Sequence, residues 1–161
     1  MHYCCTYDSP IGLLTLAADG ESLTGLWMEG QLHFAQGHPK LQSKPDLPVF
    51  RQVVAWLDDY FAGKAPSAED LPLKPTGSPF RQEIWRILVR IPYGKTVTYG
   101  QIATMLGRPM SAQAVGNAVG HNPIGIIIPC HRVLGNGGKL TGYAGGTDRK
   151  HWLLRHEGSL N

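Results

Sequence analysis

Apolar runs separated by short polar breaks fill the first 28 residues, and this pattern predicts strands. The segment "GLLTLAADGESLTGLWM" places Asp19 and Gly20 between two apolar runs, which is a strong signal for a hairpin turn. Residues 29–46 are polar and predict a loop. The glycine and prolines that break this segment are Gly37, Pro39 and Pro45.

The apolar period changes over residues 47–62, which predicts a helix ending near Gly63. Apolar side chains recur there at i, i+3, i+4, i+7 and i+11, at Phe50, Val53, Val54, Leu57 and Phe61. The next stretch, "KAPSAEDLPLKPTGS", is rich in proline and has no helical period. It predicts a boundary between two domains, residues 1–76 and residues 77–161.

The second domain is predicted to begin with a helix, because Ser78 suits an N-cap and Pro79 suits the first turn. Two short helices joined by a tight turn follow. Thr98 and Gln101 match a capping box for the first, and Ser111 can cap the second, "SAQAVGNAVG". This arrangement resembles a helix-turn-helix. The small residues of the second helix permit close approach either to another helix or to a DNA groove, and both interpretations stay open.

The remaining segments surround a cysteine. The segment "GIIIP" before Cys130 predicts a short buried strand, and the glycine-rich "RVLGNGGKLTGYAGG" after it predicts a loop or hairpin. The segment "TDRKHWLLRHEG" predicts a final helix capped by Thr147 or Asp148 and ended by Gly158.

The composition fits a folded globule, with 42% hydrophobic and 17% charged residues among 161. No apolar run approaches the roughly 20 residues that span a bilayer, so we expect no membrane association. The N-terminus lacks the pattern of a secretory signal. The cysteines, Cys4, Cys5 and Cys130, are a poor disulfide framework. We therefore expect a cytoplasmic, reducing location and a free thiol at Cys130.

The charges divide unevenly along the chain. Residues 1–78 hold five Lys or Arg and nine Asp or Glu, a net charge of −4, whereas residues 79–161 hold ten and three, a net charge of +7. A basic half indicates either an anionic partner such as nucleic acid or an ordinary solvated face.

The motif "PCHR" leaves four interpretations of Cys130: a core residue, a metal ligand, a nucleophile that turns over, and a nucleophile used once. Burial raises a thiol pKa, and a nearby His or Arg lowers it. Neighbours on a strand face apart, so His131 reaches the thiol only if the chain turns or water bridges them. Glu157 is a candidate to orient the imidazole.

Zinc is the weakest interpretation, because no second ligand pair accompanies Cys130. A metal site in the first domain would have to use residues from one set: His2, Cys4, Cys5, His33 and His38. Adjacent cysteines on a strand face apart, so we expect no metal there.

Several motifs together carry a family resemblance. "PCHRV", preceded by "SAQAVGNAVGHNPIGII" and followed by "GYAGG" and "WLLRHEG", resembles the O6-alkylguanine-DNA alkyltransferases, also called methylated-DNA–protein-cysteine methyltransferases. The resemblance is highly specific from Pro79 to Gly158 and looser before it. It implies an α+β fold, with an N-terminal ribonuclease H-like sheet and helix and a C-terminal winged-helix-like helix-turn-helix domain.

The resemblance also implies a reaction. Cys130 would accept an alkyl group from the O6 position of guanine, or from O4 of thymine, once and irreversibly. His131 would act as base through water, Glu157 would orient His131, and Asn122 would be the hinge before the active-site segment. No cofactor is implied, and the protein is expected to be a monomer.

The implied partner is double-stranded DNA carrying alkylated guanine, bound through its minor groove. A base inside a duplex must be flipped out before a protein thiol reaches it. Tyr99 would press on the target phosphate. The other implied DNA contacts are Ser111, Ala112, Gln113 and Arg132. The implied pocket residues for the base are Tyr143, Ala144, Gly145 and Lys150.

One position departs from the family pattern. Many relatives have an arginine where this chain has Gln113, and that arginine enters the stack in place of the flipped base. Two other functions compete with alkyl transfer. A non-catalytic lesion-binding module of the same fold typically has tryptophan in place of Cys130, and a cysteine hydrolase would turn over on an ester or amide.

Overall fold

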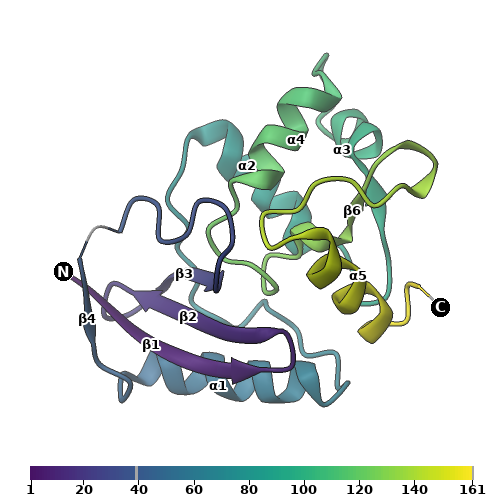
Figure 1. The fold of residues 1–161 in the computed structure, drawn as a ribbon. Coiled ribbons are helices and arrows are strands. Elements are labelled where there is room, and N and C mark those ends of the chain that lie inside the picture. Colours follow the sequence, from purple (N-terminus) through teal and green to yellow (C-terminus); the bar gives the residue numbers. More distant parts are fainter. Residues whose placement is uncertain (39, 161) are drawn as a thin grey trace. The chain divides into compact units, whose positions relative to one another are not determined.

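The computed structural model describes residues 1–38 and 40–160, so Pro39 of the expected loop and the C-terminal Asn161 lie outside the described residues. The chain divides into two compact units. The first contains Met1–Thr76 and Pro123–Gly125, and the second contains Gly77–Asn122 and Ile126–Asn161. The predicted α+β class is confirmed (Figure 1).

The first unit is a sheet covered on one face by a helix (Figure 1). Its strands are ordered β3-β2-β1-β4. Their bounds are β1 His2–Ser9, β2 Gly12–Ala18, β3 Leu23–Met28 and β4 Leu41–Ser43. The first three pair antiparallel, whereas β4 lies parallel to β1. Helix α1, Pro48–Phe61, packs on β1 and β2, as its apolar period predicts.

The predicted hairpin between β2 and β3 is confirmed. The Asp19 carboxylate accepts hydrogen bonds from the backbone N–H groups of Glu21 at 3.0 Å and Ser22 at 2.9 Å. Gly20 has φ of 115°, a conformation that side chains disfavour. Strand β4 lies within the segment predicted to be a loop, so that prediction is wrong for three residues.

The second unit contains the helix-turn-helix and the cysteine. Its helices are α2 Pro79–Val89, α3 Tyr99–Met105, α4 Ala112–Gly120 and α5 Thr147–His156. Short 3₁₀ turns cover Cys130–Arg132 and Asn136–Gly138. Strands β5, Val97–Thr98, and β6, Val133–Leu134, pair in parallel. Helix α4 packs against both α2 and α3 (Figure 1).

Most of the predicted caps are confirmed. The Ser78 hydroxyl accepts from the Arg81 N–H at 3.2 Å, and the Ser111 hydroxyl accepts from the Ala114 N–H at 3.0 Å. At α3 the reciprocal capping box of Thr98 and Gln101 is complete, with distances of 3.1 and 2.8 Å. The cap predicted for α5 is wrong: Thr147 is already helical, and Gly146 occupies the N-cap without a side-chain bond.

A short segment after α4 returns to the first unit. The Leu26 N–H donates to the Pro123 carbonyl at 2.8 Å, and the Gly125 N–H donates to the Leu26 carbonyl at 3.0 Å. Strand β3 therefore holds Pro123–Gly125 by its backbone, within the unit that also contains the sheet.

Candidate active site

Cys130 opens a 3₁₀ turn rather than following a strand. The isoleucine run before it is a buried turn, in which Ile126 has φ of 66°. The predicted strand is therefore wrong, since a β-branched apolar run filled the core through a turn instead. The Arg132 N–H donates to the Pro129 carbonyl at 3.0 Å and closes the 3₁₀ turn. The backbone therefore turns at Cys130–Arg132, and such a turn is one of the two conditions under which His131 can act on the Cys130 thiol.

Cys130 is 7% exposed, and its thiol lies among polar groups. Burial raises the pKa of this thiol, while hydrogen bonds with Asn122 and Tyr143 and the charge of Lys150 lower it in part. Because the net direction is upward, the thiol holds its proton at neutral pH. A base is therefore required before Cys130 can attack.

His131 is fully buried and bonded to a carboxylate. Its Nε2 lies 2.7 Å from Oε2 of Glu157, and both side chains are 0% exposed. Burial lowers the pKa of His131, and the Glu157 bond and charge oppose that shift. In the neutral ring, the bond to Glu157 places the proton on Nε2 and leaves Nδ1 as an acceptor. Among the described residues, Nδ1 is buried and has no hydrogen-bond partner.

Glu157 is shared between His131 and a buried arginine. Arg132 donates from Nε to Oε1 at 2.7 Å and from Nη2 to Oε2 at 3.1 Å. Burial would raise the pKa of Glu157, but His131 and Arg132 outweigh it and lower the pKa to about 2. The carboxylate is therefore ionised throughout the neutral range.

Arg132, which the family resemblance implies to be a DNA contact, is buried and bonded inside the protein. The residue is 8% exposed, and its third nitrogen, Nη1, donates to the Ile91 carbonyl at 2.6 Å. The Tyr93 ring lies 5.8 Å from the guanidinium carbon. Each of its three nitrogens thus donates a hydrogen bond inside the protein, and its side chain is largely withdrawn from solvent. Sequence reasoning missed Ile91 and Tyr93, since neither carries a motif and both lie about forty residues upstream.

Asn122 and Tyr143 reach the thiol from different segments. The Asn122 amide donates to the Ile128 carbonyl at 2.7 Å, which pins the isoleucine turn. Tyr143 is half-buried and hydrogen-bonded to Cys130, and burial raises the pKa of its hydroxyl well above the usual value. Ala144 and Gly145 form the half-buried turn that follows. The sequence-predicted residues Cys130, Asn122 and Tyr143 are thus brought together.

Lys150 is 0% exposed and braces the glycine-rich loop. Its ammonium donates to the Val133 carbonyl at 2.6 Å and to the Thr141 carbonyl at 3.0 Å. Burial lowers the pKa of Lys150 to about 8. These two hydrogen bonds of the ammonium go to backbone carbonyl groups. Lys150 would therefore act on a bound base by holding the loop in position and through its charge near Cys130.

The helix-turn-helix presents an exposed start to α4, while the small residues farther along have inner contacts. A Cβ added at Gly116 would lie 3.7 Å from the Tyr99 ring, and the Ala118 carbonyl accepts from Nε1 of Trp85 at 2.9 Å. Exposed residues occupy the start of the helix: Ser111, Ala112 and Gln113. Packing inside the unit therefore accounts for Gly116 and Ala118, whereas the start of the helix is exposed to solvent.

Tyr99 lies half-buried at the start of α3. Burial raises the pKa of its hydroxyl, a hydrogen bond with Thr141 partly opposes this, and the charge of a Cys130 thiolate adds to the rise. Tyr99 therefore keeps its proton at neutral pH, close enough to Cys130 to sense its charge.

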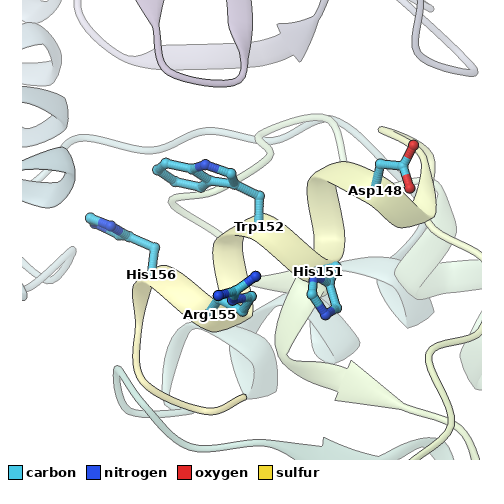
Figure 2. A pocket seen from close by; sticks show the side chains of 5 residues that line it. All are labelled: Asp148, His151, Trp152, Arg155 and His156. Carbon is cyan, nitrogen blue, oxygen red and sulfur yellow. The ribbon is translucent and has the colours of Figure 1, made fainter. Parts of the chain in front are cut away.

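A surface pocket of about 410 Å³ lies on α5, and none of the predicted site residues lines it. Its lining residues are Asp148, His151, Trp152, Arg155 and His156 (Figure 2). The Trp152 and His156 rings stack at 4.9 Å between centroids, and they point away from His151 and Arg155 (Figure 2).

The described residues contain no group of three or more His, Cys, Asp or Glu side chains placed to hold a metal ion. In the first unit, His38 bonds the Thr24 hydroxyl at 3.1 Å through Nε2, and Cys5 is buried with its pKa raised by desolvation to about 11. No helix within residues 1–38 and 40–160 has both the length and the apolar character needed to cross a membrane.

Both halves of the chain match models of one protein family. Residues 2–75 match the model described as "6-O-methylguanine DNA methyltransferase, ribonuclease-like domain". Residues 79–159 match the model described as "6-O-methylguanine DNA methyltransferase, DNA binding domain".

Whole proteins and a solved structure agree with these matches. The methylated-DNA–protein-cysteine methyltransferase of Mycobacterium bovis is 48% identical over 159 residues, covering 99% of this chain and 93% of that protein. The enzyme of the same name from Haemophilus influenzae is 43% identical over 155 residues, covering 96% and 86%. The structure of Mycobacterium tuberculosis OGT in complex with DNA superposes with a TM-score of 0.85 at 45% identity, covering 99% of this chain and 94% of that one.

Proposed function

Because the chain belongs to the 6-O-methylguanine DNA methyltransferase family, we propose that Cys130 accepts the alkyl group, with His131 as its base. The activity of the chain is that of a methylated-DNA–[protein]-cysteine S-methyltransferase, which repairs DNA by direct reversal. The family resemblance of the sequence motifs is thereby confirmed. The observation that carries the proposal for Cys130 is its place in a 3₁₀ turn beside a buried His131–Glu157 pair.

The first step is removal of the thiol proton. One water molecule carries this proton from Cys130 to Nδ1 of His131, the nitrogen that is buried and has no protein partner among the described residues. Glu157, ionised and bonded to Nε2, stabilises the imidazolium that forms. Tyr143 and Asn122 donate hydrogen bonds to the sulfur, which favours the thiolate.

The second step is alkyl transfer. The thiolate electron pair forms a bond to the alkyl carbon, the bond from that carbon to O6 breaks, and its electron pair stays on guanine. Tyr99, which keeps its proton at neutral pH, supplies a proton to the leaving base. Solvent then returns the proton of His131 to Tyr99, so that the thiol proton replaces the alkyl group overall.

The product is a thioether at Cys130, and it explains single use. A thioether has no carbonyl carbon for water to attack, so the acyl-type hydrolysis that regenerates a cysteine hydrolase is closed to it. The protein therefore acts once and is consumed.

We place DNA against the exposed start of α4, with the minor groove over Ser111, Ala112 and Gln113. Small and uncharged side chains there permit a close approach to the groove. Flipping the alkylated nucleotide costs a few kcal/mol, and Tyr99 and Gln113 are the residues we assign to meeting that cost.

The test of the proposed function is intact-protein mass spectrometry after mixing with a duplex that contains O6-methylguanine. We expect one methyl group per protein molecule, located by peptide mapping at Cys130. Repeated turnover by one molecule, or methylation at Cys4 or Cys5, would overturn the assignment.

Gln113→Ala is expected to slow repair of duplex DNA by about tenfold, a barrier change of ~1.4 kcal/mol, because nothing then fills the space of the flipped base. The same variant should react normally with free O6-methylguanine, which needs no flipping. Single-turnover rates on the two substrates measure the difference.

The matched control is Gln52→Ala, which removes another exposed glutamine, from α1 in the first unit. It should leave both rates unchanged. Equal slowing of Gln113→Ala on duplex and free base would mean that this residue supports the fold or the pocket instead of flipping.

A further inference from the structure

Arg132 joins segments that are distant in the sequence. It starts from the 3₁₀ turn of Cys130, bonds both oxygens of Glu157 at the end of α5, and bonds the Ile91 carbonyl just beyond α2. The Tyr93 ring lies beside it. Arg132 is the cation that fixes the position of Glu157, and Glu157 in turn fixes the ring of His131.

The charges around His131 come from several elements. Glu157 and Lys150 belong to α5 and its end, whereas Arg132 and Cys130 belong to the same 3₁₀ turn as His131. Tyr93 faces the Arg132–Glu157 pair from the segment after α2. With a neutral imidazole, Arg132 balances the charge of Glu157 inside the protein. A buried charge pair that loses one partner leaves the other uncompensated.

Without Arg132, the Glu157 carboxylate would have His131 as its nearest partner. A carboxylate held against an imidazole favours the imidazolium form. A protonated His131 has no free acceptor on Nδ1, so it has no site for the proton of Cys130.

We propose that Arg132 is a positioning residue that takes up the charge of Glu157 and thereby keeps His131 an unprotonated base. It touches neither the alkyl group nor the thiol, and it acts through Glu157. The proposal rests on the proposed function for its effect on rate, but the state of the His131 ring is separate from it.

The geometry requires arginine at this position. The guanidinium spans two carboxylate oxygens and a backbone carbonyl with fixed directions. Lysine would keep the charge but not the bidentate bond. The two functions of Arg132, charge and position, can therefore be separated by substitution.

The experiment compares Arg132→Met, Arg132→Lys and a control, Arg155→Met, which removes an exposed guanidinium from the last turn of α5. Single-turnover transfer from free O6-methylguanine is measured from pH 5 to 10, so that DNA binding does not enter. The ring nitrogens of His131 are titrated in parallel by ¹⁵N NMR, with their signals assigned from a His131→Gln sample. Circular dichroism checks folding, and Arg132→Gln replaces Arg132→Met if the latter does not fold.

For Arg132→Met, we expect the rise of rate with pH to move upward by about one unit, which lowers the rate by about tenfold at pH values below both midpoints. The NMR midpoint of His131 should move by the same amount. For Arg132→Lys, both midpoints should stay near those of the wild type while the plateau rate falls. Arg155→Met should match the wild type in every respect.

Unchanged midpoints in Arg132→Met would overturn the proposal and leave Arg132 a brace of the fold. An unchanged plateau in Arg132→Lys would remove the positioning role. If the wild type transfers no alkyl group to Cys130, the proposed function fails, while the NMR titration still decides what Arg132 does to His131.

Discussion

Cys130→Ser is expected to abolish alkyl transfer and to leave duplex DNA binding within about twofold of the wild type. Serine is close in size to cysteine, so the buried 3₁₀ turn can accommodate it. The serine hydroxyl is a far weaker acid than a thiol, so His131 would generate very little alkoxide at neutral pH. Thiolates are also much the better nucleophiles for an alkyl carbon. The exposed start of α4 is unaffected by the change.

Two measurements check this outcome. Mass spectrometry reads transfer, and a gel-shift titration at fixed salt reads binding. Cys5→Ser is the matched control, because Cys5 is also a buried free thiol but lies on β1. It should transfer normally. Loss of DNA binding in a well-folded Cys130→Ser protein would show that the cysteine has a structural function.

Glu157→Gln is expected to lower the free energy of unfolding at pH 7 by roughly 3 kcal/mol. The pKa of this carboxyl is about 2 in the folded protein against an ordinary value of 4.5. A lowered pKa adds stability that is complete above about pH 4.5 and is lost as the pH falls towards 2. The difference amounts to roughly 3 kcal/mol. The substitution also leaves Arg132 buried without its anion, which is costly in itself.

Urea denaturation at several pH values measures the effect. The wild type should lose stability between pH 4.5 and 2, and much of that slope should vanish in Glu157→Gln. Glu83→Gln is the control, because Glu83 makes a similar two-bond pair with Arg108, at 2.6 and 3.0 Å, on the exposed surface. It should change little, since solvent screens exposed pairs. Equal losses in the two variants would contradict the buried-pair argument.

Transfer by Glu157→Gln should slow without stopping, because the thiol remains.

Local chemistry is the part of this fold that the sequence predicted well. The Asp19–Gly20 turn and the Thr98–Gln101 capping box were readable because each is formed by residues within three positions of one another. The same holds for the Ser111 cap of α4. In each case the side chain and the backbone group that it satisfies are neighbours in the chain.

The errors arose where partners are distant. Strand β4 is only three residues long and is defined by its parallel pairing with β1, which no local pattern reveals. The isoleucine run consists of residues that favour strands, but a buried turn removes their side chains from water equally well. The DNA contact expected for Arg132 came from the family resemblance, and the partners that the structure gives it are Glu157, 25 positions away, and Ile91, 41 positions away.

Strand β3 also bears on what counts as a domain in this protein. Its backbone bonds to Pro123 and Gly125 mean that the chain passes between units at Thr76–Gly77, again after Asn122, and once more before Ile126. The continuous segment from residue 77 to residue 161 therefore differs from the compact unit that contains Cys130, because that unit does not include Pro123–Gly125. If the chain were cut after residue 76, the segment between Asn122 and the isoleucine turn would lose the strand that holds it. The strand that holds this segment is thus about a hundred residues upstream of it, and no motif near the cysteine includes it.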